Sequence, residues 1–225
     1  MAKSVQQMFD NISPRYDLLN RFLSLRRDVA WRRKAARCAG DADRVLDLCG
    51  GTGDFLLSWQ KQWGTSAEAV IGDFSFKMLQ QAQQKSLKAP LVQCDALDLP
   101  FKDGSFELVL CGFGMRNFSG YHRALDELHR VLDESGRVVI LDFFKPTHIG
   151  TKFFYGILAP IFIPFIGAFF SGRKEAYDYL VKSVRNFVSA AEFQHQALQH
   201  GFKKAKIKAL DGGIAHLVVL DKYEK

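Results

Sequence analysis

The sequence is poor in cysteine, and the cysteines that it has are not arranged for metal binding or redox chemistry. Its four cysteines, Cys38, Cys49, Cys94 and Cys111, stand singly, with no two closer than 11 positions. This spacing excludes the C-x-x-C motifs of zinc and thiol-redox sites and gives no disulfide framework. The six histidines also lack ligand spacing, so we expect no metal.

An apolar leader is lacking too. The first 17 residues contain no apolar run like that of a secretory signal peptide, so we expect a cytoplasmic protein with reduced thiols. With 48% hydrophobic and 24% charged residues, the 225-residue chain has the composition of a globular domain. Disordered and collagen-like chains are therefore excluded.

Charge is distributed unevenly along the chain, whose formal net charge is +7. Residues 1–40 carry nine basic and three acidic side chains, residues 41–170 carry 12 and 15, and residues 171–225 carry 10 and 6. Both ends are therefore basic, while the middle is slightly acidic. A basic segment attracts nucleic acid, an anionic membrane surface or an acidic substrate, and net charge does not choose among them.

Short aliphatic runs alternate with helical runs through most of the chain. Strands are predicted at 44–49, 67–73, 90–94, 106–112 and 136–143, with helices at 54–63, 76–87 and 121–132. This alternation is typical of βαβ units in a parallel sheet. A helix at 189–201 then precedes strands at 202–210 and 213–222, joined through Asp211-Gly212-Gly213, which predicts a hairpin and an antiparallel last strand. The expected fold is a seven-stranded α/β sheet with helices on both faces.

Two segments lie outside this repeat. Residues 1–40 are predicted to be a basic helical segment, and residues 146–186 interrupt a core formed by residues 41–145 and 187–225. The insertion contains 18 consecutive uncharged residues, 153–170, which is long enough to span a membrane. Pro160 and Pro164 would break such a helix. We therefore expect a broken helical cap that covers an apolar pocket or dips into a membrane surface.

A glycine-rich turn after the first predicted strand is the strongest local signal. The run Asp47-Leu48-Cys49-Gly50-Gly51-Thr52-Gly53 lets the backbone approach a ligand closely, because Gly51 and Gly53 carry no side chain. A dinucleotide-binding Rossmann turn would have a third glycine where Leu56 stands. The next two strands end in Gly72-Asp73 and Cys94-Asp95-Ala96, so carboxylates meet at one edge of the sheet. Such carboxylates can accept hydrogen bonds from ribose hydroxyls and an adenine amino group.

The motifs DLCGGTGDF, GDFSFKML, CDALDLPF and ELVLCGFGMRNF together resemble the class I S-adenosylmethionine-dependent methyltransferases. With MFDNISPRYDLLNRFLS, DVAWRR, AYDYLVKSV and GGIA, the sequence is similar over almost its whole length to the C-methyltransferases of menaquinone and ubiquinone biosynthesis. The resemblance implies a Rossmann-like fold with S-adenosylmethionine as cofactor. One position departs from the family, which usually has glycine after Ser-Leu where this chain has Arg26.

The resemblance also implies residue roles. Asp47, Gly51, Thr52 and Gly53 would hold the methionine part of the cofactor, Asp73 its ribose, Met78 one face of its adenine, and Asp95 with Ala96 the adenine edge. Tyr16 would close over the site, and Arg116 and Asn117 would face the quinone ring.

The implied reaction needs an ionised hydroxyl beside the nucleophilic ring carbon. A phenol titrates near pH ~10, so a cation such as Arg116, a lone charge in FGMRN, would lower that pKa. The residues leave the proton acceptor open among His122, Tyr16, Asp17 and a water polarised by Arg116.

Three rival interpretations remain. An NAD-dependent oxidoreductase is disfavoured by Leu56 and by the lack of a suitable Tyr-x-x-x-Lys pair. Amino-methylating nucleic-acid enzymes usually carry Asn/Asp-Pro-Pro-aromatic where Gly112-Phe113-Gly114-Met115 stands, so we expect no nucleic-acid partner. A lipid-binding module with a vestigial cofactor fold conflicts with the intact glycines and carboxylates.

The expected substrate is a polyprenyl quinol, demethylmenaquinol, with the ubiquinone precursor 2-methoxy-6-polyprenyl-benzoquinol as the alternative. The basic ends predict salt-sensitive peripheral contact with the inner face of an anionic membrane. The sequence leaves a homodimer open.

Overall fold

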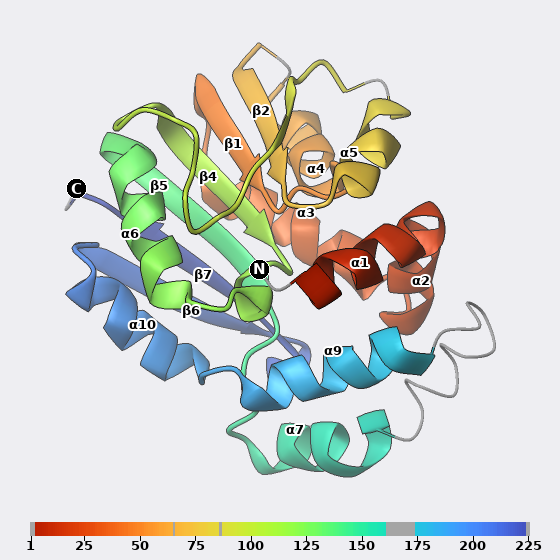
Figure 1. Cartoon of the computed structure of the whole chain (residues 1–225). Helices are drawn as coiled ribbons and strands as arrows, with labels where there is room; N and C mark the ends of the chain where they lie inside the picture. Colours follow the sequence, from red (N-terminus) through yellow and green to blue (C-terminus); the bar gives the residue numbers. More distant parts are fainter. Residues whose placement is uncertain (1–2, 65, 86, 161–173, 224–225) are drawn as a thin grey trace.

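The computed structural model describes residues 3–64, 66–85, 87–160 and 174–223. Its centre is a seven-stranded sheet in the order β3-β2-β1-β4-β5-β7-β6 (Figure 1). The strands are β1 (Arg44–Leu48), β2 (Glu68–Asp73), β3 (Leu91–Gln93), β4 (Phe106–Gly112), β5 (Leu132–Asp142), β6 (Lys204–Leu210) and β7 (Ala215–Asp221). Strand β7 is antiparallel to both β5 and β6, and the other pairs are parallel. The predicted α/β fold with an antiparallel last strand is confirmed.

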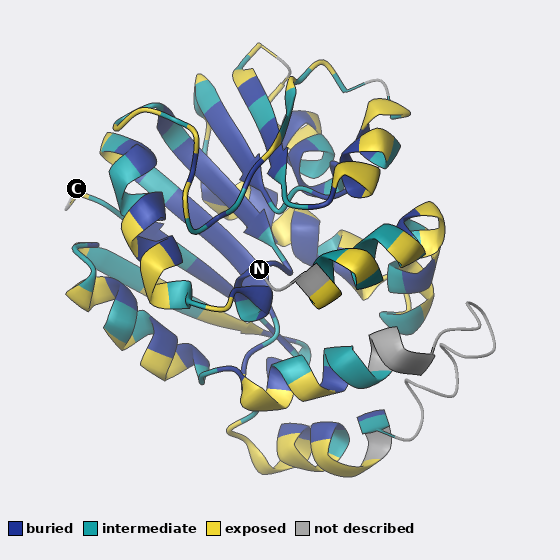
Figure 2. Ribbon diagram, in the orientation of Figure 1, coloured by how far each residue is buried: buried dark blue, intermediate teal, exposed yellow. Residues whose placement is uncertain are grey.

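Helices cover both faces of the sheet, because alternate strand residues point to opposite sides and are apolar on each side. Val45 packs with the buried residues of α3 (Arg27–Ala39), α4 (Asp54–Trp63) and α5 (Phe76–Gln83). Its neighbour Leu46 packs with those of α6 (Tyr121–Val131) and α10 (Ala190–Gln199). Both faces are therefore apolar, as in other parallel sheets, and the central strands in Figure 2 are almost entirely buried.

The remaining helices lie beyond the carboxyl ends of the central strands (Figure 1). The N-terminal segment forms α1 (Lys3–Ile12), a 3-10 turn η1 (Ser13–Arg15) and α2 (Tyr16–Leu23), which leads into α3. The insertion forms α7 (Ile149–Phe153), a π-helical turn η3 (Phe154–Leu158) and α9 (Lys174–Asn186). This is the edge of a parallel sheet where ligands bind, so both segments are placed to build a site.

The boundaries differ from the predicted ones by more than two residues in two places. Strand β5 begins at Leu132 rather than at residue 136, because Leu132 pairs with Phe106 across an irregularity in the β4–β5 register. Helix α5 ends at Gln83, several residues before its predicted end. The predicted hairpin is confirmed: β6 and β7 pair from Lys204 to Leu210, and a 3-10 turn η4 (Asp211–Gly213) joins them.

The apolar run 153–170 is described only as far as residue 160, and the rest of it lies outside the described residues. Its described part is helical, with Tyr155 and Ala159 buried. No helix in the described ranges is both long and apolar enough to cross a membrane.

The Ser24–Arg26 turn between α2 and α3 has a backbone conformation that suits glycine better than the arginine found here. Arg26 precedes α3 with φ 62°, in the left-handed region that favours glycine. Leu25, next to it, has φ 51°. Arg26 therefore occupies a backbone conformation that the glycine usual in the family would adopt without strain.

Candidate functional site

The loop from Cys49 to Gly53 links β1 to α4 and forms the floor of a cavity. A Cβ atom on Gly50 would come within 2.7 Å of the Ile71 side chain and 2.8 Å of the Asp47 carbonyl oxygen. Gly51 and Gly53 have φ values of 57° and 78°, and the Gly53 N–H donates to the Gly50 carbonyl over 2.8 Å. The loop thus requires glycine for both space and conformation.

Asp47 points into the start of this loop from β1. Its carboxylate is fully buried, and Oδ2 accepts a hydrogen bond from the Leu56 N–H over 3.0 Å. Oδ1 is buried with no hydrogen-bond partner in the described part of the chain. Burial raises the pKa of Asp47 to about 7. A buried, unpaired carboxylate oxygen is costly unless a ligand pairs with it, so this position fits the amino group of S-adenosylmethionine.

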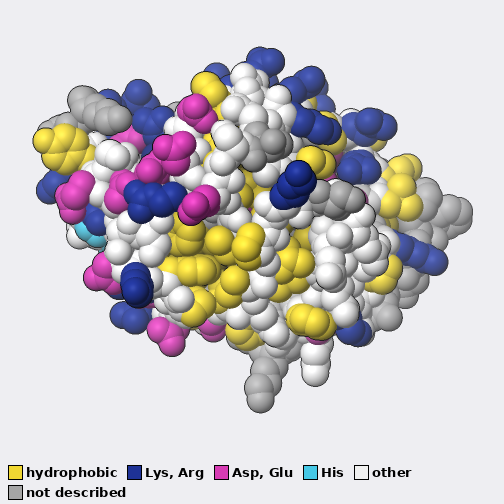
Figure 3. Space-filling model, turned by 90° about the horizontal axis from the view of Figure 1, so that it is seen from above, with side chains coloured by type: hydrophobic (Ala, Val, Ile, Leu, Met, Phe, Trp, Pro, Cys, Tyr) yellow, Lys and Arg dark blue, Asp and Glu magenta, His cyan; other side chains and the backbone are white. Residues whose placement is uncertain are grey.

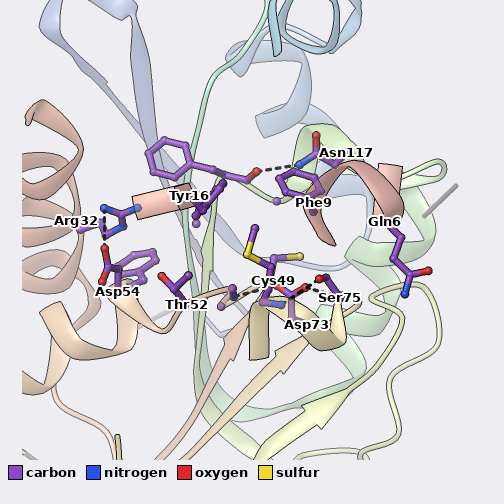
Figure 4. A pocket seen from close by; sticks show the side chains of 17 residues that line it. Gln6, Phe9, Tyr16, Arg32, Cys49, Thr52, Asp54, Asp73, Ser75 and Asn117 are labelled. Carbon is purple, nitrogen blue, oxygen red and sulfur yellow. Dashed lines mark hydrogen bonds and ion pairs between the residues drawn. The ribbon is translucent and has the colours of Figure 1, made fainter. Parts of the chain in front are cut away.

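Asp73 lies at the carboxyl end of β2, beside the same loop (Figure 4). Its Oδ2 accepts from the Gly51 N–H over 2.9 Å, and its Oδ1 accepts from the Ser75 N–H over 2.8 Å. Burial raises its pKa to about 6. The two N–H groups fix the carboxylate and leave lone pairs for the hydroxyls of a ribose.

The other predicted cofactor residues lie around these two carboxylates. Met78 is buried and lines the same cavity as Asp73. Asp95 and Ala96 line an adjacent hollow that also contains Asp73 and Cys49. The predicted cofactor residues therefore lie along the ends of β1, β2 and β3, but Asp47 and Gly53 line neither of these two hollows. The part of the cofactor that each residue contacts stays a prediction.

The cofactor cavity, lined by Tyr16, Gly51, Thr52, Asp73 and Met78 among others, encloses about 50 Å³. Ligand pockets usually enclose about 300–1,000 Å³. The cavity is small because Phe9 and Tyr16, from the N-terminal segment, lie over the loop in Figure 4. Helix α1 is fastened above it by hydrogen bonds from Gln6 to the Phe74 carbonyl and from Ser75 to Asp10. The N-terminal segment therefore limits the size of the cavity in this conformation.

Thr52 takes part in a cluster of charges that sequence reasoning missed. Its hydroxyl donates to Asp17 over 2.6 Å and accepts from Lys85 over 2.9 Å. Lys85 also pairs with Asp17 and Asp54, each at 2.5 Å. These contacts link α2 to the loop and to the start of α4. Asp17, one of the candidate proton acceptors, therefore pairs with Thr52 and Lys85 on the cofactor side.

A second cavity of about 440 Å³ lies against the first. Phe9, Tyr16 and Phe113 line both cavities, so the two cavities adjoin at these side chains. The rest of the second cavity is mostly apolar and is lined by the N-terminal segment, the insertion and a few core residues. The lining side chains include Ile12, Leu19, Leu23, Trp31, Phe143, Phe154, Tyr155, Leu180 and Val184.

Arg116 lines this cavity together with three other charged residues, Arg27, Asp28 and Asp211, and it is not the lone charge that the sequence suggests. Its side chain is 6% exposed and pairs with the fully buried Asp142 at 2.5 Å. The same nitrogen donates to the Phe113 carbonyl over 2.7 Å, while Nε is buried with no partner among the described residues. Burial alone would lower the pKa of Arg116, but Asp142 outweighs it and raises that pKa. A buried donor is thus left for a ligand.

Asn117 is held from both ends of its amide. Its Nδ2 donates to the Phe113 carbonyl over 3.0 Å, and its Oδ1 accepts from the Tyr179 hydroxyl over 3.1 Å. Tyr179 belongs to α9, so the insertion directly fixes a predicted ring-facing residue. Asn117 lines the first cavity, whereas Tyr179 lines the second. Tyr155, from η3, donates to the Ile214 carbonyl over 3.1 Å and also lines the second cavity.

His122 lies elsewhere. It is exposed on α6, where its Nδ1 lies 3.1 Å from Nε2 of His200, and it lines neither cavity. The structure gives no support for His122 as the proton acceptor, because its side chain lies outside both cavities. Tyr16 lines both cavities, and burial raises its pKa.

Asp142, Tyr155 and Tyr179 are the main site residues that sequence reasoning missed. Asp142 carries the same signal as Asp73, a carboxylate at the carboxyl end of a parallel strand, and could have been found by it. The described residues contain no cluster of three or more His, Cys, Asp or Glu side chains suited to a metal.

Solved structures with the same fold include two S-adenosylmethionine-dependent methyltransferases. One from Thermotoga maritima aligns with a TM-score of 0.69 at 16% identity, over 96% of this chain and 98% of its own. One from Aquifex aeolicus aligns with a TM-score of 0.62 at 18% identity, over 84% and 88%. At these identities the likeness concerns the fold alone.

Three curated relatives are named demethylmenaquinone methyltransferase. The one from Thermus thermophilus is 39% identical over 96% of this chain and 100% of its own. Those from Deinococcus radiodurans and Staphylococcus aureus are 41% and 35% identical, over 98% and 95% of this chain and 93% and 90% of theirs. Residues 1–220 match the ubiE/COQ5 methyltransferase family, and the chain belongs to that family.

Proposed function

We propose that this enzyme transfers a methyl group from S-adenosylmethionine to a ring carbon of demethylmenaquinol. The observation that carries the proposal is that a polar cavity adjoins a larger apolar one, with Phe9, Tyr16 and Phe113 lining both. The methyl group of a cofactor in the first cavity would contact a hydrophobic ring in the second where the two cavities adjoin, with these side chains beside the reacting atoms. The relatives named demethylmenaquinone methyltransferase support the choice of acceptor.

The cofactor supplies an electrophilic methyl group on a sulfonium ion, and the chain supplies its position. Asp47 would pair with the amino group, Asp73 with the ribose, and Met78, Asp95 and Ala96 would border the adenine. Thr52, with Gly51 and Gly53, would contact the methionine part. The contact between Asp47 and a cation would relieve the cost of its unpaired oxygen.

On the acceptor side, the free Nε of Arg116 would donate to the quinol oxygen next to the reacting carbon. Donation to the ionised oxygen lowers the pKa of that hydroxyl, and each unit is worth about 1.4 kcal/mol. Because Asp142 pairs with Arg116 at 2.5 Å, the effect is that of a directed hydrogen bond more than of an isolated cation. Asn117, which lines the cofactor cavity, would approach the ring from the cofactor side. The hydroxyl proton would leave to a water beside Arg116, because burial raises the pKa of Tyr16 and keeps its own hydroxyl protonated. The new bond from the ring carbon to the methyl group replaces the bond from sulfur to methyl, S-adenosylhomocysteine leaves, and the ring proton is lost to water as the ring becomes aromatic again.

We also propose that residues 1–40 and 146–186 form a substrate cap around the prenyl tail, and that the enzyme contacts an anionic membrane peripherally. The basic N-terminal segment and the apolar cavity between the two segments support this proposal.

The test uses the purified enzyme, S-adenosylmethionine with a labelled methyl group, and chemically reduced demethylmenaquinone with a short, soluble tail. We expect labelled menaquinol, identified by mass spectrometry, and less product from 2-methoxy-6-polyprenyl-benzoquinol. Cofactor binding in calorimetry without methylation of demethylmenaquinol would refute the proposed acceptor.

A further inference from the structure

Arg32, on α3, is a buried cation to which the proposed function gives no role. Lys and Arg side chains usually lie at the surface of a protein, as they do on the face shown in Figure 3. The side chains of Arg32 and Arg116 are each only 6% exposed. Arg116 lines the second cavity, whereas Arg32 lines the cofactor cavity together with Gly51 and Thr52. Each cavity therefore has its own buried arginine.

Acidic side chains account for only part of the Arg32 guanidinium group. Its Nη1 donates to the buried Asp28 over 2.7 Å and lies 3.8 Å from the carboxylate of Asp54, beside which Figure 4 shows it. In the described part of the chain, no hydrogen bond uses Nη2 or Nε. The guanidinium carbon also lies 5.4 Å from the centre of the Phe113 ring, which lines both cavities. The group is thus fixed at one nitrogen and over one ring, and two nitrogens are left for a ligand.

The start of α4 lies next to this guanidinium group, because Asp54 is the first residue of the helix. Gly53 precedes the helix and offers no side-chain cap, and Thr52 lines the cavity. A helix N-terminus combines a partial positive charge with free backbone N–H groups, and both favour an anion. The carboxylate of Asp54 itself pairs with Lys85 at 2.5 Å. An anionic group of a ligand would therefore contact the helix end and Arg32 together.

Asp47, buried at the start of the glycine-rich loop, supplies the opposite charge. Burial raises the pKa of Asp47 to about 7, and the Leu56 N–H and the positive charge of Arg32 oppose that rise. Asp47 and Arg32 are therefore close enough to interact. An α-amino acid carries an ammonium and a carboxylate group on one carbon atom, so a site that recognises it needs an anion and a cation near each other. Asp47 and Arg32 form such a pair.

We propose that Arg32 binds the carboxylate of the methionine part of S-adenosylmethionine through Nη2 and Nε, together with the N-terminus of α4. The inference rests on the proposed function, in which Asp47 receives the amino group of the same methionine. The planar fork of an arginine suits a carboxylate, which can accept two parallel N–H···O bonds from it. Trp31, the neighbour of Arg32, lines the second cavity. Helix α3 would thus contact both reactants and help to hold the methyl group against the ring.

The experiment is calorimetric titration of the full-length enzyme with S-adenosylmethionine and with its decarboxylated form. The second ligand keeps the sulfonium, the amine and the nucleoside but lacks the carboxylate. We expect the wild type to bind S-adenosylmethionine about tenfold to a hundredfold more tightly, which is typical of hydrogen bonds between charged groups. Arg32→Gln should bind the two ligands with affinities within a few-fold of each other.

Two further variants complete the series. Arg32→Lys keeps a cation beside Asp28 but lacks the fork, so it should retain only a several-fold preference for the carboxylate. It decides the question if circular dichroism shows that Arg32→Gln does not fold. Arg33→Gln, at an exposed position of the same helix, is the matched control and should keep the full preference of the wild type.

The preference for the carboxylate separates binding from a structural role. Equal loss of affinity for both ligands in the Arg32 variants would mean that Arg32 only supports the fold, and it would overturn the inference. So would a wild type without the preference, or an Arg32→Lys enzyme that keeps all of it. These titrations contain no methyl acceptor. If Arg32→Gln loses the preference but the wild type methylates no quinol, the proposed acceptor fails and the role of Arg32 stands.

Discussion

The buried pair of Arg116 and Asp142 gives the sharpest test of how this site is built. Asp142 is fully buried at the end of β5, and Oδ1 accepts from Arg116 over 2.5 Å and from the Phe143 N–H over 2.7 Å. Its Oδ2 accepts from the Arg116 backbone N–H over 3.2 Å. The substitution Asp142→Asn keeps the shape of the side chain but removes its negative charge. It also replaces one carboxylate oxygen, which accepts hydrogen bonds, by an NH₂ group that faces other N–H donors.

Breaking a buried ion pair from one side typically costs about 3–5 kcal/mol, because the remaining charge loses its partner. We therefore expect Asp142→Asn to lower the free energy of unfolding by about that amount in urea titrations, with loss of methyl transfer. The double variant Arg116→Met with Asp142→Leu removes both charges and should regain part of the lost stability. The recovery stays partial because the backbone N–H groups of Arg116 and Phe143 lose their acceptor, at about 1–3 kcal/mol for each unpaired donor. The double variant should remain inactive, because the donor to the quinol oxygen is gone.

The matched control is Asp126→Asn, which removes an exposed partner of His200. Its effect on unfolding should stay below about 1 kcal/mol. An Asp142→Asn enzyme as stable as the wild type would refute the argument that Asp142 balances a buried charge. A fully active double variant would refute the role of Arg116 in the reaction.

Three further outcomes are expected. Arg116→Ala should abolish turnover while calorimetry finds the cofactor affinity within a few-fold of the wild type; wild-type turnover would exclude the proposed role. Arg26→Gly should raise the free energy of unfolding by about 1 kcal/mol, because glycine adopts φ 62° without strain; an unchanged or lower value in urea titration would contradict the strain. Burial raises the pKa of Asp47 to about 7 from 3.8, so its ionisation destabilises the fold progressively from about pH 4 and fully above pH 7. Asp47→Asn should therefore be about 1–3 kcal/mol more stable than the wild type at pH 8, a figure that allows for the cost of an unpaired amide, and it should lose this advantage at pH 5. The variant should also bind the cofactor poorly. Equal stability of the variant and the wild type at pH 8 would count against a buried charge at Asp47.

The sequence predicts the cofactor side of the site well because its signals are local. Asp47, Gly51 and Gly53 lie within one strand and one turn, and Asp73 follows directly from the end of the next strand. Parallel strands bring such ends to one edge of the sheet whatever the rest of the chain does. Because strands and helices alternate, the parallel strands all end at the same edge of the sheet, and the carboxylates of Asp47 and Asp73 lie close to one another there.

The acceptor side depends on contacts between distant segments, which no local pattern encodes. Asn117 meets Tyr179 from α9, and Thr52 meets Asp17 and Lys85 from two other elements. A charge such as Arg116 appears lone in the sequence for the same reason, since its partner Asp142 is 26 positions away. His122 illustrates the opposite error, because a residue close in sequence to FGMRN points outward on the next helix.

Charge separation links the interior of this molecule to its surface. The cofactor is a cation before transfer, and the carboxylates that would receive it, Asp47 and Asp73, come from the slightly acidic middle of the chain. Because burial raises the pKa of both groups, each holds its charge at an energetic cost that a cationic ligand offsets. The excess of basic residues lies in the segments outside the core, where Arg26 and Arg33 face outward. One chain thereby combines buried carboxylates that would receive a cation with basic segments at its surface, and the two cavities that would hold the reactants adjoin at Phe9, Tyr16 and Phe113.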